Sequence, residues 1–178
     1  MSTPLKLRAV DEDDLAVLGT CLQDALVPVH DMCFIGAERR FVMVANRFRW
    51  EGLKPAARRG EGPEAKTADE PEGAYERVHC GITIEHVARV QTRGFTPGSE
   101  TDAGRLLEVL TILPEEGALT LVFAGGAAVR LEVERIEVFV EDVDEPWPTL
   151  WRPHHPFDEG PVDEGPVDEG VDRGGGTR

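Results

Sequence analysis

The stretch Arg77-Val78-His79-Cys80-Gly81-Ile82-Thr83-Ile84 alternates polar and apolar residues from end to end. Successive side chains of a β-strand point to opposite faces, so this alternation predicts a strand with one buried and one exposed face. Similar patterns recur on both sides of it. Further strands are predicted at Leu5–Val10, Val29–Ile35, Phe41–Trp50, Arg105–Leu113, Leu119–Ala124 and Val129–Val133. The segment Val87–Phe95 either continues the strand at Arg77–Ile84 or forms the next strand.

Two segments show the spacing of a helix. Asp11 is a suitable N-cap, and the acidic residues that follow it favour the positive end of a helix dipole. Apolar residues then recur at intervals of three and four, which predicts a helix that ends before Pro28. The pattern of Arg135–Val143 fits either a strand or a helix, and we favour the helix.

Turn signals recur about every ten residues, as in Gly36–Arg40 and Pro114–Gly117. Such short connections favour antiparallel pairing over βαβ crossovers. We therefore expect an α+β fold, a mostly antiparallel sheet or small partly open barrel of about seven strands, with one N-terminal and one C-terminal helix. A pleckstrin-homology-like barrel plugged by the C-terminal helix is one fold of this kind, although fold analogy alone carries no function.

The chain divides into three parts by composition. Residues 1–153 are expected to form a single domain, interrupted by a long loop at residues 52–73 that is rich in Gly, Pro and charges. Residues 154–178 contain an acidic repeat with a period of five, Phe157–Pro161, then Val162–Pro166, then Val167–Gly170. Such a sequence has too few apolar residues to offset the entropy lost on ordering, so a disordered tail is predicted.

Charge and cysteine usage restrict the class of protein. The formal net charge is −15, which argues against a nucleic-acid partner, because phosphate binding needs clustered Lys and Arg. No apolar run is long enough to span a membrane, and the N-terminus lacks a secretory signal pattern, so we expect a cytoplasmic protein. The three cysteines are widely spaced among apolar neighbours, which predicts buried thiols rather than a zinc site.

Motifs of known chemistry are absent from the sequence: there is no nucleophile elbow, phosphate loop or dinucleotide fingerprint. We assign no catalytic residue, no cofactor and no metal. His79 and Cys80 are adjacent in a predicted strand and therefore point to opposite faces, so they cannot ligate one ion together without a bulge. Runs such as Glu115-Glu116 are interpreted as solvated surface.

One constellation of side chains is a candidate binding site. Residues 39–93 hold eleven Lys or Arg against eight acids, the only basic part of the chain, and include Asn46-Arg47-Phe48-Arg49-Trp50. Arg47 and Arg49 would share one strand face, and Arg77, Arg89 and Arg93 would follow on later strands. Converging guanidiniums would bind a carboxylate or phosphate. Alternatively, these arginines pair across strands with Glu51, Glu76 and Glu85. The candidate ligand-binding residues are Arg47, Arg49, Trp50, Arg77 and Arg89.

The chain also resembles an uncharacterised family of small alphaproteobacterial proteins, known as domain of unknown function 2948, over roughly Pro4–Pro153. The segments that carry the resemblance are Leu5–Asp11, Leu22–Ala25, Asn46–Glu51, Phe123–Gly126 and Arg130–Val133. The resemblance implies no catalytic residues. Genes of this family often lie near histidine-biosynthesis genes, which implies at most a metabolic neighbourhood.

These observations give one leading function hypothesis and two rivals. We expect a non-enzymatic binding or interaction module that uses the basic, aromatic strand region to bind an anionic small molecule or a protein partner. The first rival is a small enzyme or metabolic accessory factor, linked to histidine biosynthesis by gene neighbourhood, with a site built from His79, His86 and Glu85. The second is a subunit or homodimer that associates through a strand edge or an apolar patch.

Overall fold

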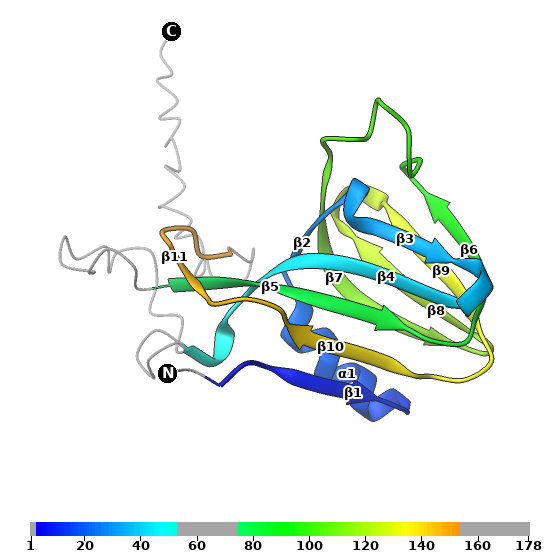
Figure 1. Ribbon diagram of the computed structural model, residues 1–178, viewed down its shortest axis with the longest axis horizontal. Coiled ribbons are helices and arrows are strands. Elements are labelled where there is room, and N and C mark those ends of the chain that lie inside the picture. Colours follow the sequence, from blue (N-terminus) through cyan, green and yellow to red (C-terminus); the bar gives the residue numbers. More distant parts are fainter. Residues whose placement is uncertain (1–2, 53–74, 154–178) are drawn as a thin grey trace, which may run out of the picture.

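The computed structural model describes residues 3–52 and 75–153, shown in Figure 1. One α-helix, α1 (Glu12–Leu22), accompanies eleven strands in these residues. The strands are β1 (Lys6–Ala9), β2 (Leu26–Pro28), β3 (Met32–Ile35), β4 (Arg40–Phe48), β5 (Tyr75–Ile84), β6 (Val87–Arg93), β7 (Leu106–Glu115), β8 (Ala118–Phe123), β9 (Ala128–Val133), β10 (Val138–Asp142) and β11 (Trp147–Thr149). Short 3-10 turns are η1 (Val29–Asp31), η2 (Gly36–Glu38), η3 (Trp50–Gly52) and η6 (Ala124–Gly126).

The strands form one curled sheet in the order β1-β10-β5-β4-β2-β7-β8-β9-β6. Every strand pair in the described residues is antiparallel, as the short connections predicted. Strands β1 and β6 end the order without pairing to each other, so the sheet does not close. Two short strands lie off this path, because β3 pairs only with β4 and β11 only with β5.

Helix α1 begins and packs as its sequence predicts. The Asp11 side chain accepts a hydrogen bond of 2.8 Å from the backbone N–H of Asp14, which satisfies one of the unpaired donors of the first turn. Leu15, Leu18 and Leu22 are buried on one face. This face packs the helix against β1 and β7 (Figure 1).

The core is the inner face of the curled sheet. On β5, Val78, Cys80, Ile82 and Ile84 are each at most 1% exposed, so the alternation that predicted this strand is confirmed. Strand β5 lies between β4 on one side and β10 with β11 on the other. It is therefore the strand on which the N-terminal and C-terminal parts of the sheet meet.

The predicted C-terminal helix is wrong. Within Arg135–Val143 the structure has strand β10, which pairs with both β1 and β5. Val138 and Val140 are buried and Phe139 lies on the other face, so the period of two decides the structure. Strand β5 pairs with β4 on one side, and its backbone groups on the other side are available to β10. The β-branched residues of β10 also pack well in a strand. The part of the chain that the structure describes therefore holds one α-helix, not two.

The predicted number of strands, about seven, is too low. The longer strands are found where they were predicted, but β2 and β11 have three residues each, too few to show a period in the sequence. The predicted strand Val29–Ile35 begins as the turn η1 and becomes β3 only at Met32. The predicted loop at residues 52–73, except for Gly52, and the predicted tail at 154–178 lie outside the described residues.

A glycine fixes the path of the chain after β6. Gly94 has a φ of +80°, and a Cβ placed there would lie 3.1 Å from the Cα of Ala127. Gly98 has a similar φ of +76°, but a Cβ there would meet nothing within 4 Å. We predict that Gly98→Ala costs about 1 kcal/mol of unfolding free energy for its backbone conformation, and that Gly94→Ala costs at least twice as much. Urea denaturation of both variants measures this, and equal costs would contradict the close backbone approach.

Candidate functional site

Arg47 occupies a position on the inner face of β4 that its neighbours fill with apolar side chains. Phe41, Met43 and Ala45 precede it at every second residue and are buried, and Arg47 itself is only 1% exposed. An unpaired charge at such a position would cost several kcal/mol. The Arg47 guanidinium therefore needs carboxylate partners close to it.

Two carboxylates bind the Arg47 guanidinium in fork geometry. Nε and Nη2 donate to Asp142 at 2.7 and 2.8 Å, and Nη1 and Nη2 donate to Glu51 at 3.1 and 2.7 Å. Asp142 also accepts a 2.8 Å hydrogen bond from the backbone N–H of Leu5. One buried side chain thus connects β4, β10, η3 and the segment that enters β1.

The charges of this cluster stabilise each other. Burial alone would raise the pKa of Asp142, but hydrogen bonds from Arg47 and from Leu5 outweigh it and lower the pKa below its ordinary value. The pKa of Glu51 is lowered in the same way, against burial, mainly by the hydrogen bonds of Arg47. Burial raises the pKa of the neighbouring Cys80 thiol to about 12, although Arg47 acts in the opposite direction. Cys80 is therefore an unreactive thiol at neutral pH.

Arg49 is also engaged by carboxylates. It is 6% exposed, it forms an ion pair with Glu76, and its Nε lies 3.5 Å from Glu51. Its backbone N–H donates to the carbonyl of Glu76 at 3.0 Å, which extends the pairing of β4 and β5 beyond Phe48. Arg47 and Arg49 therefore both contact Glu51, and both have the carboxylate partners of the alternative interpretation.

Aromatic side chains gather at the same end of the sheet, on the face opposite to Arg47, around Phe48, which is itself buried. The rings of Phe48 and Trp50 are 4.6 Å apart, and that of Tyr75 lies 5.8 Å from Phe48. The guanidinium of Arg77 lies over the Phe48 ring at 5.9 Å, and its Nη1 donates to the carbonyl of Asn46 at 3.0 Å. Burial lowers the pKa of Arg77, and nearby Asp24 and Glu108 act in the opposite direction.

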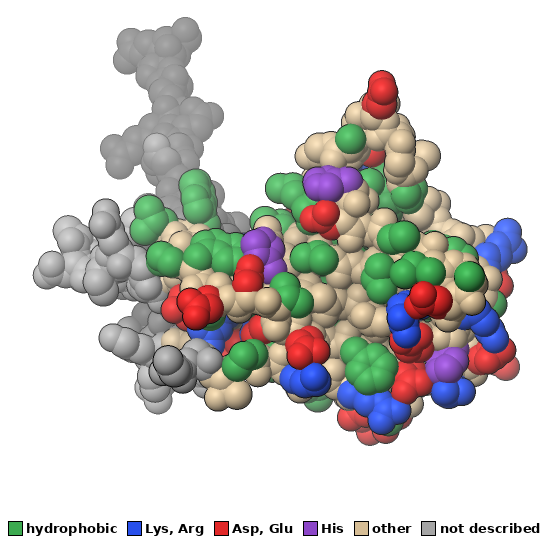
Figure 2. All heavy atoms as spheres, in the orientation of Figure 1, with side chains coloured by type: hydrophobic (Ala, Val, Ile, Leu, Met, Phe, Trp, Pro, Cys, Tyr) green, Lys and Arg blue, Asp and Glu red, His purple; other side chains and the backbone are tan. Residues whose placement is uncertain are grey.

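Strand β11 extends this aromatic surface. The rings of Trp147 and His79 are 4.4 Å apart, and His79 Nδ1 lies 2.5 Å from Asp144. Leu150 and Trp151 follow β11 and are 73% and 80% exposed. We call the group of Phe48, Trp50, Tyr75, Arg77, His79, Trp147, Leu150 and Trp151 the aromatic end. It holds all three tryptophans and the one tyrosine of the chain, and Figure 2 shows hydrophobic side chains gathered where β5 begins.

The structure brings some of the predicted site residues together and separates others. Arg47, Arg49 and Trp50 lie within four residues at the end of β4, and Arg77 on β5 is paired with Phe48 of β4. Arg89 lies on β6 at the other end of the sheet order, is 64% exposed, and is 4.0 Å from Glu132. Arg47, Arg49 and Arg77 face five carboxylates. Those carboxylates belong to Asp24, Glu51, Glu76, Glu108 and Asp142.

The histidines of the enzyme hypothesis lie apart, because His79 is in the middle of β5 and His86 is beyond its end. His79 pairs with Asp144, whereas His86, in the turn after the strand, pairs with Glu137 at 2.7 Å. The five steps of extended strand from His79 to Ile84 alone span roughly 16 Å. Glu85 binds Arg40 instead, at 2.8 Å. In residues 3–52 and 75–153, no group of three or more His, Cys, Asp or Glu is arranged to hold a metal ion, and no helix is long and apolar enough to cross a membrane.

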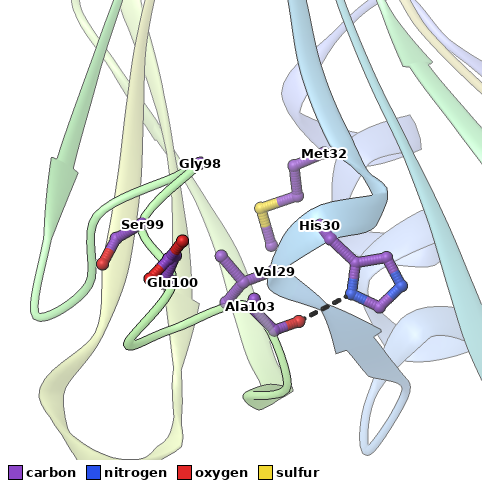
Figure 3. Close-up of a pocket in the computed structure, with 7 residues that line it drawn as sticks. All are labelled: Val29, His30, Met32, Gly98, Ser99, Glu100 and Ala103. Atoms are coloured by element: carbon purple, nitrogen blue, oxygen red, sulfur yellow. Dashed lines mark hydrogen bonds between the residues drawn. The ribbon is translucent and has the colours of Figure 1, made fainter.

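A separate surface hollow of about 290 Å³ lies between η1 and the connection from β6 to β7. Figure 3 shows Val29, His30 and Met32 on one side and Gly98, Ser99, Glu100 and Ala103 on the other. His30 Nδ1 lies 2.9 Å from the carbonyl oxygen of Ala103, which holds the connection against η1.

Asp142 and the residues of β11 were missed by the sequence reasoning. Asp142 follows Val138 and Val140 at the inward positions of β10, so a strand assignment would have shown it as a buried acid in need of a basic partner. The segment Trp147-Pro148-Thr149-Leu150-Trp151 carried a composition signal, since two tryptophans lie close together.

By fold and site, the chain has one α-helix on a curled, open antiparallel sheet, with a buried arginine cluster and an aromatic cluster at one end of the sheet. A family model described as "Protein of unknown function (DUF2948)" matches residues 5–155. The chain belongs to this family, and the predicted resemblance is confirmed. No curated protein and no solved structure matched the chain.

We predict that Arg47→Met lowers the unfolding free energy by about 3–5 kcal/mol, because it leaves Asp142 buried with an uncompensated charge. The matched control is Arg130→Met, since Arg130 pairs with Glu115 at the surface and should contribute less than about 1 kcal/mol. The double variant Arg47→Met/Asp142→Leu should recover part of the loss. Chemical denaturation gives all three values, and similar losses for Arg47→Met and Arg130→Met would contradict a stabilising role of the buried cluster.

The same cluster predicts a pH dependence. The pKa values of Asp142 and Glu51 are lowered in the folded state. Their contribution to the free energy of unfolding is therefore complete above the pKa values of the unfolded chain. It is lost as the pH falls through the lower pKa values of the folded state. In the Arg47→Met variant, burial should raise the pKa of Asp142 instead. Protonation of Asp142 at low pH then removes the unpaired buried charge. The deficit of Arg47→Met should therefore be largest near pH 7 and shrink towards about pH 3. A deficit that is constant over this range, measured by urea denaturation at each pH, would refute this assignment.

Proposed function

We propose that the protein is a non-enzymatic interaction module whose aromatic end binds a protein partner. The observation that carries this proposal is the concentration of the chain's tryptophans and its tyrosine around Arg77, with Leu150 and Trp151 largely exposed. Tryptophan, tyrosine and arginine are the residues most enriched at the energetic centres of protein interfaces.

The charge around the arginines favours a protein over an anionic small molecule. Arg47 and Arg49 already bind carboxylates in the described residues, and Arg77 has Asp24 and Glu108 nearby. Three guanidiniums facing five carboxylates leave a negative balance, which would repel a phosphate or carboxylate ligand. An apolar and aromatic contact needs no such positive balance.

An enzymatic function has less support from the geometry. His79 lies within β5, away from Glu85 and His86 in the turn that follows the strand, and each of the three pairs with a different charged residue. A histidine and a carboxylate in contact, such as His79 with Asp144, also need a nucleophile or substrate oxygen within hydrogen-bond reach to perform acid-base chemistry. The neighbour of that pair is the ring of Trp147, which is a packing surface.

A site-specific photo-crosslinker tests the proposal in cells that produce the chain. Placed at Leu150, it should give a discrete crosslinked protein, whereas at Val17, an exposed apolar position on α1, it should not. Trp151→Ser should weaken the contact by roughly 30-fold or more, since truncation of a central tryptophan costs about 2 kcal/mol or more. Because Trp151 is 80% exposed, the melting temperature of the Trp151→Ser variant should stay unchanged.

The same products at Leu150 and at Val17 would contradict the proposal. A thermal-shift screen against phosphorylated and carboxylated small molecules provides the opposing outcome, because a ligand of the folded state raises the melting temperature. A dose-dependent rise that Arg77→Ala abolishes would replace the protein partner by an anionic ligand.

A further inference from the structure

Four strands of the described residues have a partner on one side only: β1, β3, β6 and β11. An unpaired strand edge presents backbone donors and acceptors to another strand, and natural proteins block such edges with charged residues or proline. Strand β1 carries Lys6 and Arg8, β6 carries Arg89 and Arg93, and β11 carries Pro148. Strand β3 is Met-Cys-Phe-Ile and has none of these.

The side chains of β3 are also incompletely covered. Phe34 lies directly across from Phe41 on β4, so both rings belong to the same face of the sheet. Phe41 is 3% exposed, whereas Phe34 is 39% exposed. No further strand in the described residues covers the outer side of β3, and its residue Cys33 is exposed, so the predicted burial of this thiol is wrong.

The hollow shown in Figure 3 lies at the beginning of this edge, since Met32 is both the first residue of β3 and part of the lining. Its volume of about 290 Å³ is at the lower limit for small-molecule sites and suits a single side chain of an extended segment. Val29, Met32 and Ala103 give it an apolar lining.

The charges near the hollow are mostly negative. Glu100 is part of the lining, and Asp31 and Asp102 lie in the two segments that form it. Arg105 lies 3.6 Å from Asp102 and donates to the carbonyl of Gly94 at 2.5 Å. His30 Nε2 lies 3.4 Å from Asp31, so of these three carboxylates Glu100 is the one without an ion pair in the described ranges. A partner with a Lys or Arg beside the apolar side chain would complement this surface.

We propose that the outer edge of β3 and the adjoining hollow bind an extended basic segment of a partner protein by strand addition. The segment places one apolar side chain in the hollow and a Lys or Arg next to Glu100. A helix satisfies its own backbone groups and would leave those of β3 unpaired, so the occupant is a strand. This surface is distinct from the aromatic end, and the inference does not depend on the function proposed for that end.

The test uses the full chain and a defined probe, the capped seven-residue peptide with the sequence VKVKVKV. Alternate valines supply the apolar side chains, and VEVEVEV is the matched control. In NMR titrations, VKVKVKV should shift the backbone amides of Cys33, Phe34 and Glu100, and VEVEVEV should not. Bound VKVKVKV should also slow alkylation of the exposed Cys33 thiol several-fold. Alkylation of the Cys80 thiol should not change, because that thiol is buried.

Two variants separate the parts of the proposal. Glu100→Gln should weaken binding of VKVKVKV several-fold with unchanged melting temperature, and Phe34→Ser should weaken it while the amide spectrum stays that of a folded protein. No shifts up to about 1 mM peptide, or shifts confined to β1 or β6, would overturn strand addition at β3. Light scattering that shows a dimer, with the β3 amides already protected from hydrogen exchange, would assign the edge to a second copy of the chain instead.

Discussion

The buried guanidinium of Arg47 is the interaction on which the arrangement of this sheet depends. It lies among apolar side chains on the inner face of β4, where a charge is tolerated only with complete pairing. One partner, Glu51 in η3, follows it by four residues, whereas the other, Asp142 on β10, comes from a distant part of the chain. Because Asp142 also accepts from Leu5, the same cluster fixes the entry of the N-terminal strand. Folding must therefore bring these segments together before the charge can be buried.

This constraint commits the guanidiniums of the arginine-rich stretch to carboxylates of the chain itself. A guanidinium has five N–H donors. Arg47 uses Nε, Nη1 and Nη2 on two carboxylates, and Arg49 contacts Glu51 and Glu76. Glu51 contacts both arginines, so these two guanidiniums share three carboxylates. The local excess of positive charge seen in the sequence is offset by acids such as Asp142, which are distant in sequence and adjacent in space.

Local sequence patterns predicted the elements that their own residues determine. The capped helix α1, the long alternating strand β5 and the antiparallel pairing all follow from short-range periodicity and turn residues. The patterns failed at Arg135–Val143, where helix and strand periods overlap, and the available edges of β1 and β5 decide for a strand. Strands of three residues, such as β11, exist because of pairing with a longer neighbour and leave no periodic signal.

The candidate site shows the same division between local and distant information. Trp50 and Arg77 were identified from residue type and strand parity, and the structure places both beside Phe48. Trp147 and Trp151 join them only because β11 pairs with β5, a contact between residues about seventy positions apart. Arg89 was grouped with them because β6 follows β5 in sequence, yet β6 pairs with β9 and leaves the group. A surface made by pairing between distant strands can be predicted only after the pairing itself is known. In this chain, the order of the strands decides which residues become neighbours. Without that order the sequence shows a basic segment, and with it an aromatic cluster around Arg77 becomes visible.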